Sequence, residues 1–206
     1  GYSHRDIFSQ RLAPTGALRW AQDEPLSPAD WWGQGSPDMS MTGNRAAIVW
    51  MRFAGIYVQF MDVTTRAHTL PLPAQVNESD GRAKQWMVDI APLSTGPVVV
   101  AWGDDRHDNG DVYAQAINVN RQFVWPVGLE VNVPDNADDW RPRLAIDRAD
   151  RMLVVWNHND HVGIDGRLLA ANGVPVWDGD RAMNADLRQS THATAKESSG
   201  RTATAA

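Results

Sequence analysis

Two aspartates, Asp38 and Asp89, occupy one position of a repeated pattern, with Arg143 and Ala193 at that position in the next two copies. Enzymes that hydrolyse glycosidic bonds use two carboxyl groups, one as acid and the other as nucleophile or base. Two acids beside an arginine would equally suit a polar ligand. We therefore predict that Asp38, Asp89 and Arg143 bind a ligand. Because nothing marks either acid as a proton donor, no catalytic residue is assigned.

Aromatic side chains in polar segments are the second group of candidate ligand contacts. Trp31, Trp32 and Trp140 lie in such segments, which we interpret as loops that could present an aromatic platform to a sugar or a peptide. Consecutive strand residues face opposite ways, so the Trp31-Trp32 pair is the more unusual feature. We expect most of the ten tryptophans to pack in the core instead.

One acidic loop has oxygen ligands at spacings that calcium accepts, namely Asp104, Asp108 and Asp111. The loop lacks the terminal glutamate of the EF-hand pattern, and a hairpin rich in turn formers accounts for the same residues. We therefore expect no cofactor, with calcium as the alternative. The nucleophile elbow of serine hydrolases, the zinc-binding His-Glu-x-x-His pattern and a phosphate-binding glycine loop are all missing from the sequence.

The elements that must position these residues come from four copies of a pattern about 52 residues apart. In the third copy, segments 88–91, 97–102, 111–119 and 122–133 alternate with the period of strands and are separated by turn formers. Four short antiparallel strands per unit are typical of a propeller blade.

Three sets of tryptophans mark the register of the copies. One set ends matching apolar runs, a second follows the third strand, and a third is predicted to precede the inner strands. In the second set, the second copy has Thr69 instead of tryptophan. The sets are Trp50, Trp102 and Trp156; Trp20, Trp125 and Trp177; and Trp32, Trp86 and Trp140.

The two ends of the sequence supply different parts of one repeat. The N-terminal end begins at the position of a third strand, and the C-terminal end stops at the positions of a first and a second strand. We predict an all-β fold, a β-propeller of four four-stranded antiparallel blades, with one blade closed by the N- and C-terminal strands. Its single domain covers 1–206, with blades at about 189–206 plus 1–26, 36–77, 86–133 and 141–183. The alternatives are half of an eight-bladed ring and a piece of a longer array.

The composition of the chain limits the kinds of molecule that it is expected to bind. A net charge of −6 with no basic run argues against nucleic acid, and no apolar stretch reaches the roughly 20 residues that cross a bilayer. The absence of cysteine excludes disulfides and thiolate chemistry. We expect a protein or glycan ligand, no nucleic acid, no membrane insertion, and a monomer or homodimer.

Segments 6–12, 98–102 and 111–115 resemble the tandem β-propeller repeats of bacterial secreted and cell-surface proteins. This resemblance implies a propeller fold and an extracytoplasmic location, but such repeats accompany many activities, and a fold does not transfer function. Our leading interpretation is a non-enzymatic binding or scaffold protein that acts through its loop face. The alternatives are a small glycosidase or lyase with Asp38 and Asp89 near the axis, and a structural subunit of a larger assembly.

Overall fold

A computed structural model describes residues 5–28, 33–53, 55–77, 85–106, 110–135, 137–159 and 163–184. In these ranges every regular element is a strand, and all strand pairing is antiparallel. None of this described part forms a helix long and apolar enough to span a membrane.

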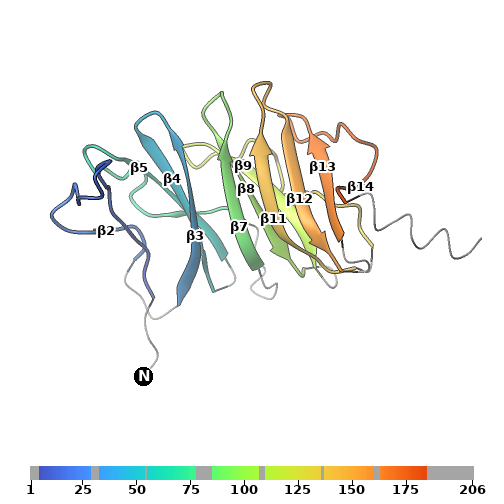
Figure 1. The fold of residues 1–206 in the computed structure, drawn as a ribbon, viewed down its shortest axis with the longest axis horizontal. Helices are drawn as coiled ribbons and strands as arrows, with labels where there is room; N and C mark the ends of the chain where they lie inside the picture. Colours follow the sequence, from blue (N-terminus) through green and yellow to red (C-terminus); the bar gives the residue numbers. More distant parts are fainter. Residues whose placement is uncertain are drawn as a thin grey trace, which may run out of the picture.

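The strands form one two-stranded and three four-stranded sheets that follow one another in chain order along the molecule (Figure 1). The innermost strands are neighbours, since β7 packs against both β3 and β11. This arrangement is all-β and propeller-like. The first sheet is β1 (Phe8–Ser9) and β2 (Glu24–Pro25); the second β3 (Gln34–Thr42), β4 (Arg45–Arg52), β5 (Gly55–Asp62) and β6 (Ala74–Gln75); the third β7 (Gln85–Pro92), β8 (Val98–Asp104), β9 (Asp111–Ile117) and β10 (Leu129–Glu130); the fourth β11 (Asp139–Ile146), β12 (Met152–His158), β13 (Gly163–Leu169) and β14 (Arg181–Ala182).

The hydrophobic core lies between successive sheets. Every residue of β8 and β9 is buried, because the third sheet is covered on one face by the second sheet and on the other by the fourth. Trp50, Trp102 and Trp156 are at most 1% exposed, which confirms the prediction of core packing for this set. Aromatic side chains of this size fill the space between sheets that stack about 10 Å apart.

All four units share a side-chain cap that joins the end of the outermost strand to the start of the third strand. A hydroxyl or amide oxygen accepts the backbone N–H of an apolar residue at the start of the third strand, in the pairs Ser27 with Ile7, Asn77 with Ile56, Asn132 with Val112 and Asn184 with Ile164. The first unit therefore supplies the third and fourth strands of a blade, as the phase of the sequence predicts. The strands expected from 189–206 lie outside the described residues.

A second repeated contact corrects the alignment of the second copy. Side-chain amides of the third strands donate to the backbone oxygens of Trp20 and Trp125, and Gln59 donates in the same way to Leu70. The buried Leu70, not Thr69, therefore takes the place of tryptophan. The prediction was wrong by one residue because the turn after β5 is longer: Met61 bridges to a residue seven positions on, whereas the equivalent bridges in the other three units span six.

Two further expectations are wrong in detail. Trp86 and Trp140 are the second residues of β7 and β11 and do not precede those strands, and Gly35 instead of Trp32 takes the corresponding place in β3. The bent fourth strand expected over 122–133 contains only the two residues of β10, since most of it is turn.

Candidate functional site

A β-bulge in each inner strand fixes the position of the predicted ligand residues. Each inner strand carries one extra residue relative to its partner, and a non-glycine residue with positive φ lies in the bulge: Ser36 (50°), Met87 (45°) and Arg141 (57°). Each predicted residue is then the first to pair after the bulge: Asp38 opposite Val49, Asp89 opposite Ala101 and Arg143 opposite Val155. The three positions are therefore structurally equivalent, as the repeat predicts.

The structure brings the two aspartates together. The Asp38 carboxyl hydrogen-bonds to the Asp89 carboxyl, and both groups are partly buried. Asp89 also accepts the backbone N–H of Ile90 at 3.0 Å and, across to the next sheet, that of Leu144 at 2.7 Å. Burial first, and then the contact with Asp38, raises the pKa of Asp89 to about 6. The two carboxyls therefore link three neighbouring inner strands, and Asp89 keeps its proton to a higher pH than an ordinary aspartate does.

This contact matters for the chemistry of the pair. Glycoside hydrolases hold their two carboxyls about 5–5.5 Å apart when they retain configuration and about 6.5–9.5 Å apart when they invert it, so that the sugar or a water fits between them. The direct contact between the Asp38 and Asp89 carboxyls matches neither arrangement. The side chain of Arg143 is exposed, and its Nη1 donates to the neighbouring Pro142 carbonyl at 3.5 Å.

Trp140 is the described member of the predicted aromatic platform. It lies on β11 instead of in a loop, its side chain is 41% exposed, and the guanidinium of Arg141 lies 4.7 Å from its ring centre. Trp31 and Trp32 lie outside the described residues. Trp140 therefore offers a flat, partly exposed ring at the start of an inner strand.

The predicted calcium loop is occupied by other contacts. Asp104 Oδ2 lies 2.6 Å from Arg106 Nη2 and accepts the indole N–H of Trp102, while Asp111 accepts a hydrogen bond from Asn132. Asp108 lies outside the described residues. Across the part of the chain that the structure describes, no three His, Cys, Asp or Glu side chains gather to hold a metal ion.

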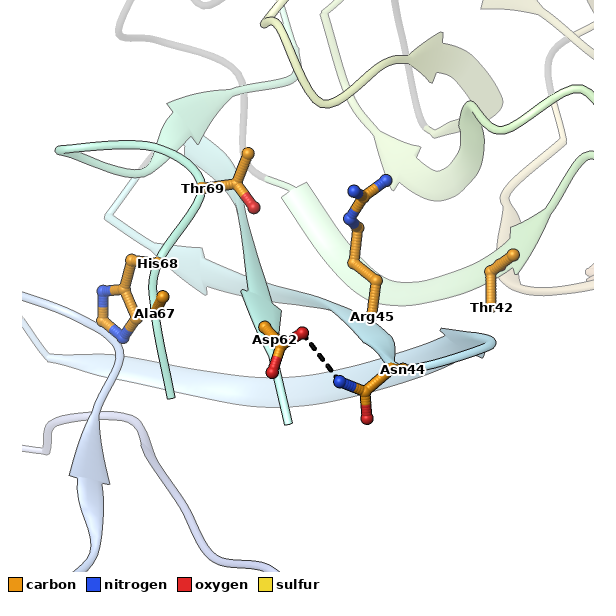
Figure 2. A pocket seen from close by; sticks show the side chains of 7 residues that line it. All are labelled: Thr42, Asn44, Arg45, Asp62, Ala67, His68 and Thr69. Carbon is orange, nitrogen blue, oxygen red and sulfur yellow. Dashed lines mark hydrogen bonds between the residues drawn. The ribbon is translucent and has the colours of Figure 1, made fainter. Parts of the chain in front are cut away.

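A polar hollow that the sequence did not predict lies at the other end of the sheets, where β3 turns into β4 and β5 ends. Its volume is about 370 Å³, and Figure 2 shows its lining: Thr42, Asn44, Arg45, Asp62, Ala67, His68 and Thr69. Because β3 and β11 run in corresponding positions of their sheets, this hollow and Trp140 lie at opposite ends of the strands.

Hydrogen bonds link the residues that line the hollow to the turn that follows β5. Asn44 Nδ2 donates to Asp62 Oδ2 at 2.7 Å, and the hydroxyl of Thr64 donates to the Asn44 side-chain oxygen at 2.9 Å. Asp62 Oδ1 accepts the backbone N–H groups of Thr64 and Thr65. The N–H of Thr65, followed by that of Thr64, lowers the pKa of Asp62 below its usual value, so this carboxylate is charged at neutral pH. The signal in the sequence was the turn-forming run Asp62-Val63-Thr64-Thr65.

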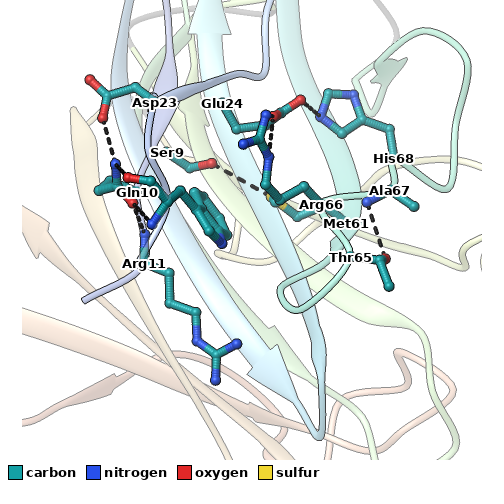
Figure 3. A network of polar contacts seen from close by, with 11 residues as sticks. Ser9, Gln10, Arg11, Asp23, Glu24, Met61, Thr65, Arg66, Ala67 and His68 are labelled. Atoms are coloured by element: carbon teal, nitrogen blue, oxygen red, sulfur yellow. Dashed lines mark hydrogen bonds and ion pairs between the residues drawn. The ribbon is translucent and has the colours of Figure 1, made fainter. Parts of the chain in front are cut away.

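The first sheet supports this turn from the side (Figure 3). Glu24 lies 2.6 Å from the guanidinium Nη2 of Arg66, accepts its Nε–H at 2.8 Å, and has its other oxygen 3.3 Å from His68 Nε2. Arg11 Nη1 donates to the Val63 carbonyl at 3.3 Å. One wall of the hollow is thus fixed by residues about 40 to 50 positions earlier in the chain.

Comparison with known proteins gives a fold but no family. Neither a protein-family model nor a curated protein sequence matches this chain. The chain is similar to the structure of a protein from Bifidobacterium bifidum provisionally assigned as an exo-beta-1,3-galactanase, at 12% identity and a TM-score of 0.50, over 84% of this chain and 57% of the other. It also matches an endo-arabinase from Bacteroides thetaiotaomicron at 13% identity and a TM-score of 0.47, over 81% of this chain and 64% of the other. The chain thus spans less than two thirds of either protein, and the first match supports the all-β, propeller-like arrangement.

Proposed function

We propose that this chain is a non-enzymatic propeller module that binds a glycan through the loops at the ends of its sheets. The observation that carries the proposal is the use of the Asp89 carboxyl, which bonds to Asp38 and to the Leu144 N–H of the next sheet. These bonds hold the inner strands together and leave the two acids too close to place a glycosidic bond between them. Binding by loops on a rigid scaffold needs no catalytic group.

A glycan is the ligand class that fits the polar surfaces of the molecule. The hollow at the end of β3 offers hydroxyl, amide, guanidinium and carboxylate groups, and its 370 Å³ is at the lower end of the range for small-molecule sites. The similar Bifidobacterium structure carries the name of a galactanase, which suggests the glycans to test first. The resemblance to secreted and cell-surface repeats and an extracytoplasmic location belong to the same proposal, and a protein ligand is the alternative.

A glycosidase or lyase is the second candidate, because the pKa of Asp89, raised to about 6, is a property expected of a general acid. The two candidates differ in turnover. The test incubates the purified chain with galactan and arabinan, measures released sugars, and measures binding to an immobilised glycan panel. Binding without release supports the module. Release that disappears when Asp38 and Asp89 are both changed to Asn would establish the enzyme instead.

The closed ring also belongs to this proposal. The strands β1 and β2 make the contacts of the third and fourth, outer strands of a blade. This favours a four-bladed ring in which 189–206 of the same chain supply the first and second strands of that blade. Half of an eight-bladed ring, acting as a structural subunit, is the alternative. A mass of about 22.8 kDa in solution supports closure within one chain, whereas a stable dimer supports the larger ring.

A further inference from the structure

The second sheet departs from the repeat in several of its turns, and two of these departures lie side by side at one end of the sheet. The turn between β3 and β4 contains two residues, 43–44, whereas the turns between β7 and β8 and between β11 and β12 contain five. The neighbouring turn after β5 is one residue longer than its three equivalents. The polar hollow lies where these two changes meet. Departures from an otherwise regular pattern are expected at functional positions.

Among the described residues, one charged side chain of the hollow has no partner. Asp62 is hydrogen-bonded to Asn44 and to backbone N–H groups, and His68 Nε2 lies 3.3 Å from a Glu24 carboxylate oxygen without making a hydrogen bond. The side chain of Arg45, the exposed first residue of β4, makes no hydrogen bond or ion pair with any described residue. In Figure 2 its guanidinium extends away from the bond between Asn44 and Asp62. This cation is therefore available to a ligand.

Unused hydrogen-bonding groups surround this cation. The hydroxyls of Thr42 and Thr69 line the hollow and bond to no described side chain or backbone group. Asp62 Oδ2 accepts one hydrogen bond, from Asn44, and a carboxylate oxygen accepts two. The hollow thus presents a free cation on one side and acceptors for hydroxyl groups on the other.

This combination selects among ligands. A free inorganic anion would gain from Arg45 but would meet the fixed negative charge of Asp62. A neutral sugar would satisfy Asp62 and the threonines but leave the guanidinium unused. A sugar acid matches both, since a planar carboxylate fits the two-pronged donor of arginine and the ring hydroxyls donate to a carboxylate.

We propose that the hollow binds a hexuronic acid residue of a glycan, with its carboxylate on Arg45 and a ring hydroxyl on Asp62. This inference rests on the proposed function and specifies its ligand class. The contact with Arg45 is charge-assisted and bidentate, so we expect it to contribute about tenfold or more to the dissociation constant.

The test measures calorimetric binding of two matched probes, an oligogalacturonate and the same oligomer after chemical reduction of its carboxyls to galactose. We expect the acid to bind and the reduced probe to bind at least tenfold more weakly. Arg45→Gln removes the difference, and Arg45→Lys retains only part of it because lysine cannot form the fork. Arg19→Gln, at another exposed arginine outside the strands, is the control that matches the change of charge.

The outcomes separate this inference from the function on which it rests. Equal binding of the two probes, or unchanged binding by Arg45→Gln, overturns the uronate site. Tighter binding of a sulfated galactose oligomer than of the uronate also overturns it. If neutral glycans on the panel bind and Arg45→Gln has no effect, only this inference fails, whereas the absence of all glycan binding removes the proposed function as well. The reduced probe tests the ligand without any variant, so the result does not depend on folding of a mutant.

Discussion

Replacing Asp38 by Asn tests the contact between the two inner-strand carboxyls. The pKa of Asp89 is about 6 in the folded chain against an ordinary value of 3.8. Because the folded state holds this proton more tightly, the contribution of Asp89 to stability is complete below about pH 4 and is lost as the pH rises through about 6. A difference of about two units corresponds to at most about 3 kcal/mol of unfolding free energy.

Asp38→Asn removes only the part of this effect that comes from Asp38. The asparagine oxygen can still accept the Met39 N–H, now at 2.8 Å, while its amide donates to Asp89 and favours the ionised form. Burial of Asp89, the larger cause of the raised pKa, is unchanged. We therefore expect the variant to be more stable than the parent at pH 8 by about 1 kcal/mol, and to lose less stability between pH 4 and pH 7.

Urea unfolding followed by tryptophan fluorescence at pH 4 to 8 measures both quantities. Asp178→Asn is the control, because Asp178 is exposed and its side chain makes no hydrogen bond or ion pair with any described residue. The reasoning fails if the stability of the parent does not fall over this pH range, or if Asp38→Asn is less stable than the parent at pH 8. The first result would mean that the pKa of Asp89 is not raised in the folded chain, and the second would mean that the two carboxyls are not in contact in solution.

Three further changes test other parts of the fold. His158→Leu removes the His158 ion-pair partner of the buried Asp139, and burial raises the pKa of Asp139 to about 7. Urea unfolding should therefore show that the variant loses about 3 kcal/mol of unfolding free energy at pH 8, and less at pH 5, where Asp139 is protonated. Gly173→Ala places a Cβ against Leu129 at a residue with φ of +82°, so the melting temperature should fall by an amount equivalent to about 1–3 kcal/mol. An unchanged melting temperature would contradict this conformation of the turn. Asn132→Ala removes the cap of β9 and should cost about 1–3 kcal/mol with increased amide exchange in that strand; unaltered exchange would show that the cap is dispensable.

The repeat made the architecture predictable. Each apolar run ending in tryptophan became a second strand, and the phase of the ends placed β1 in the third-strand position. The equivalence of Asp38, Asp89 and Arg143 also followed from alignment. Regular spacing is informative because each copy must bury the same faces against its neighbours.

The candidate site was less predictable, because it depends on local departures and on contacts between sheets. The longer turn after β5 shifted the alignment by one residue and hid both Leu70 and the hollow. The contact between Asp38 and Asp89 depends on how two neighbouring inner strands approach each other, which no spacing in one strand reports. Likewise, the freedom of Arg45 is visible only once the partners of its neighbours are known.

The extra residue after β5 leaves the ladder between β4 and β5 continuous from Arg45 opposite Asp62 to Arg52 opposite Gly55. Insertions at this rim are therefore absorbed locally, and selection can alter the length of one turn without resetting the packing of the sheets. The rim then behaves as a set of independently variable segments, as the hypervariable loops of an antibody do. Grafting the 62–69 segment onto the matching turn of the third sheet is a direct route to a second recognition surface on the same scaffold.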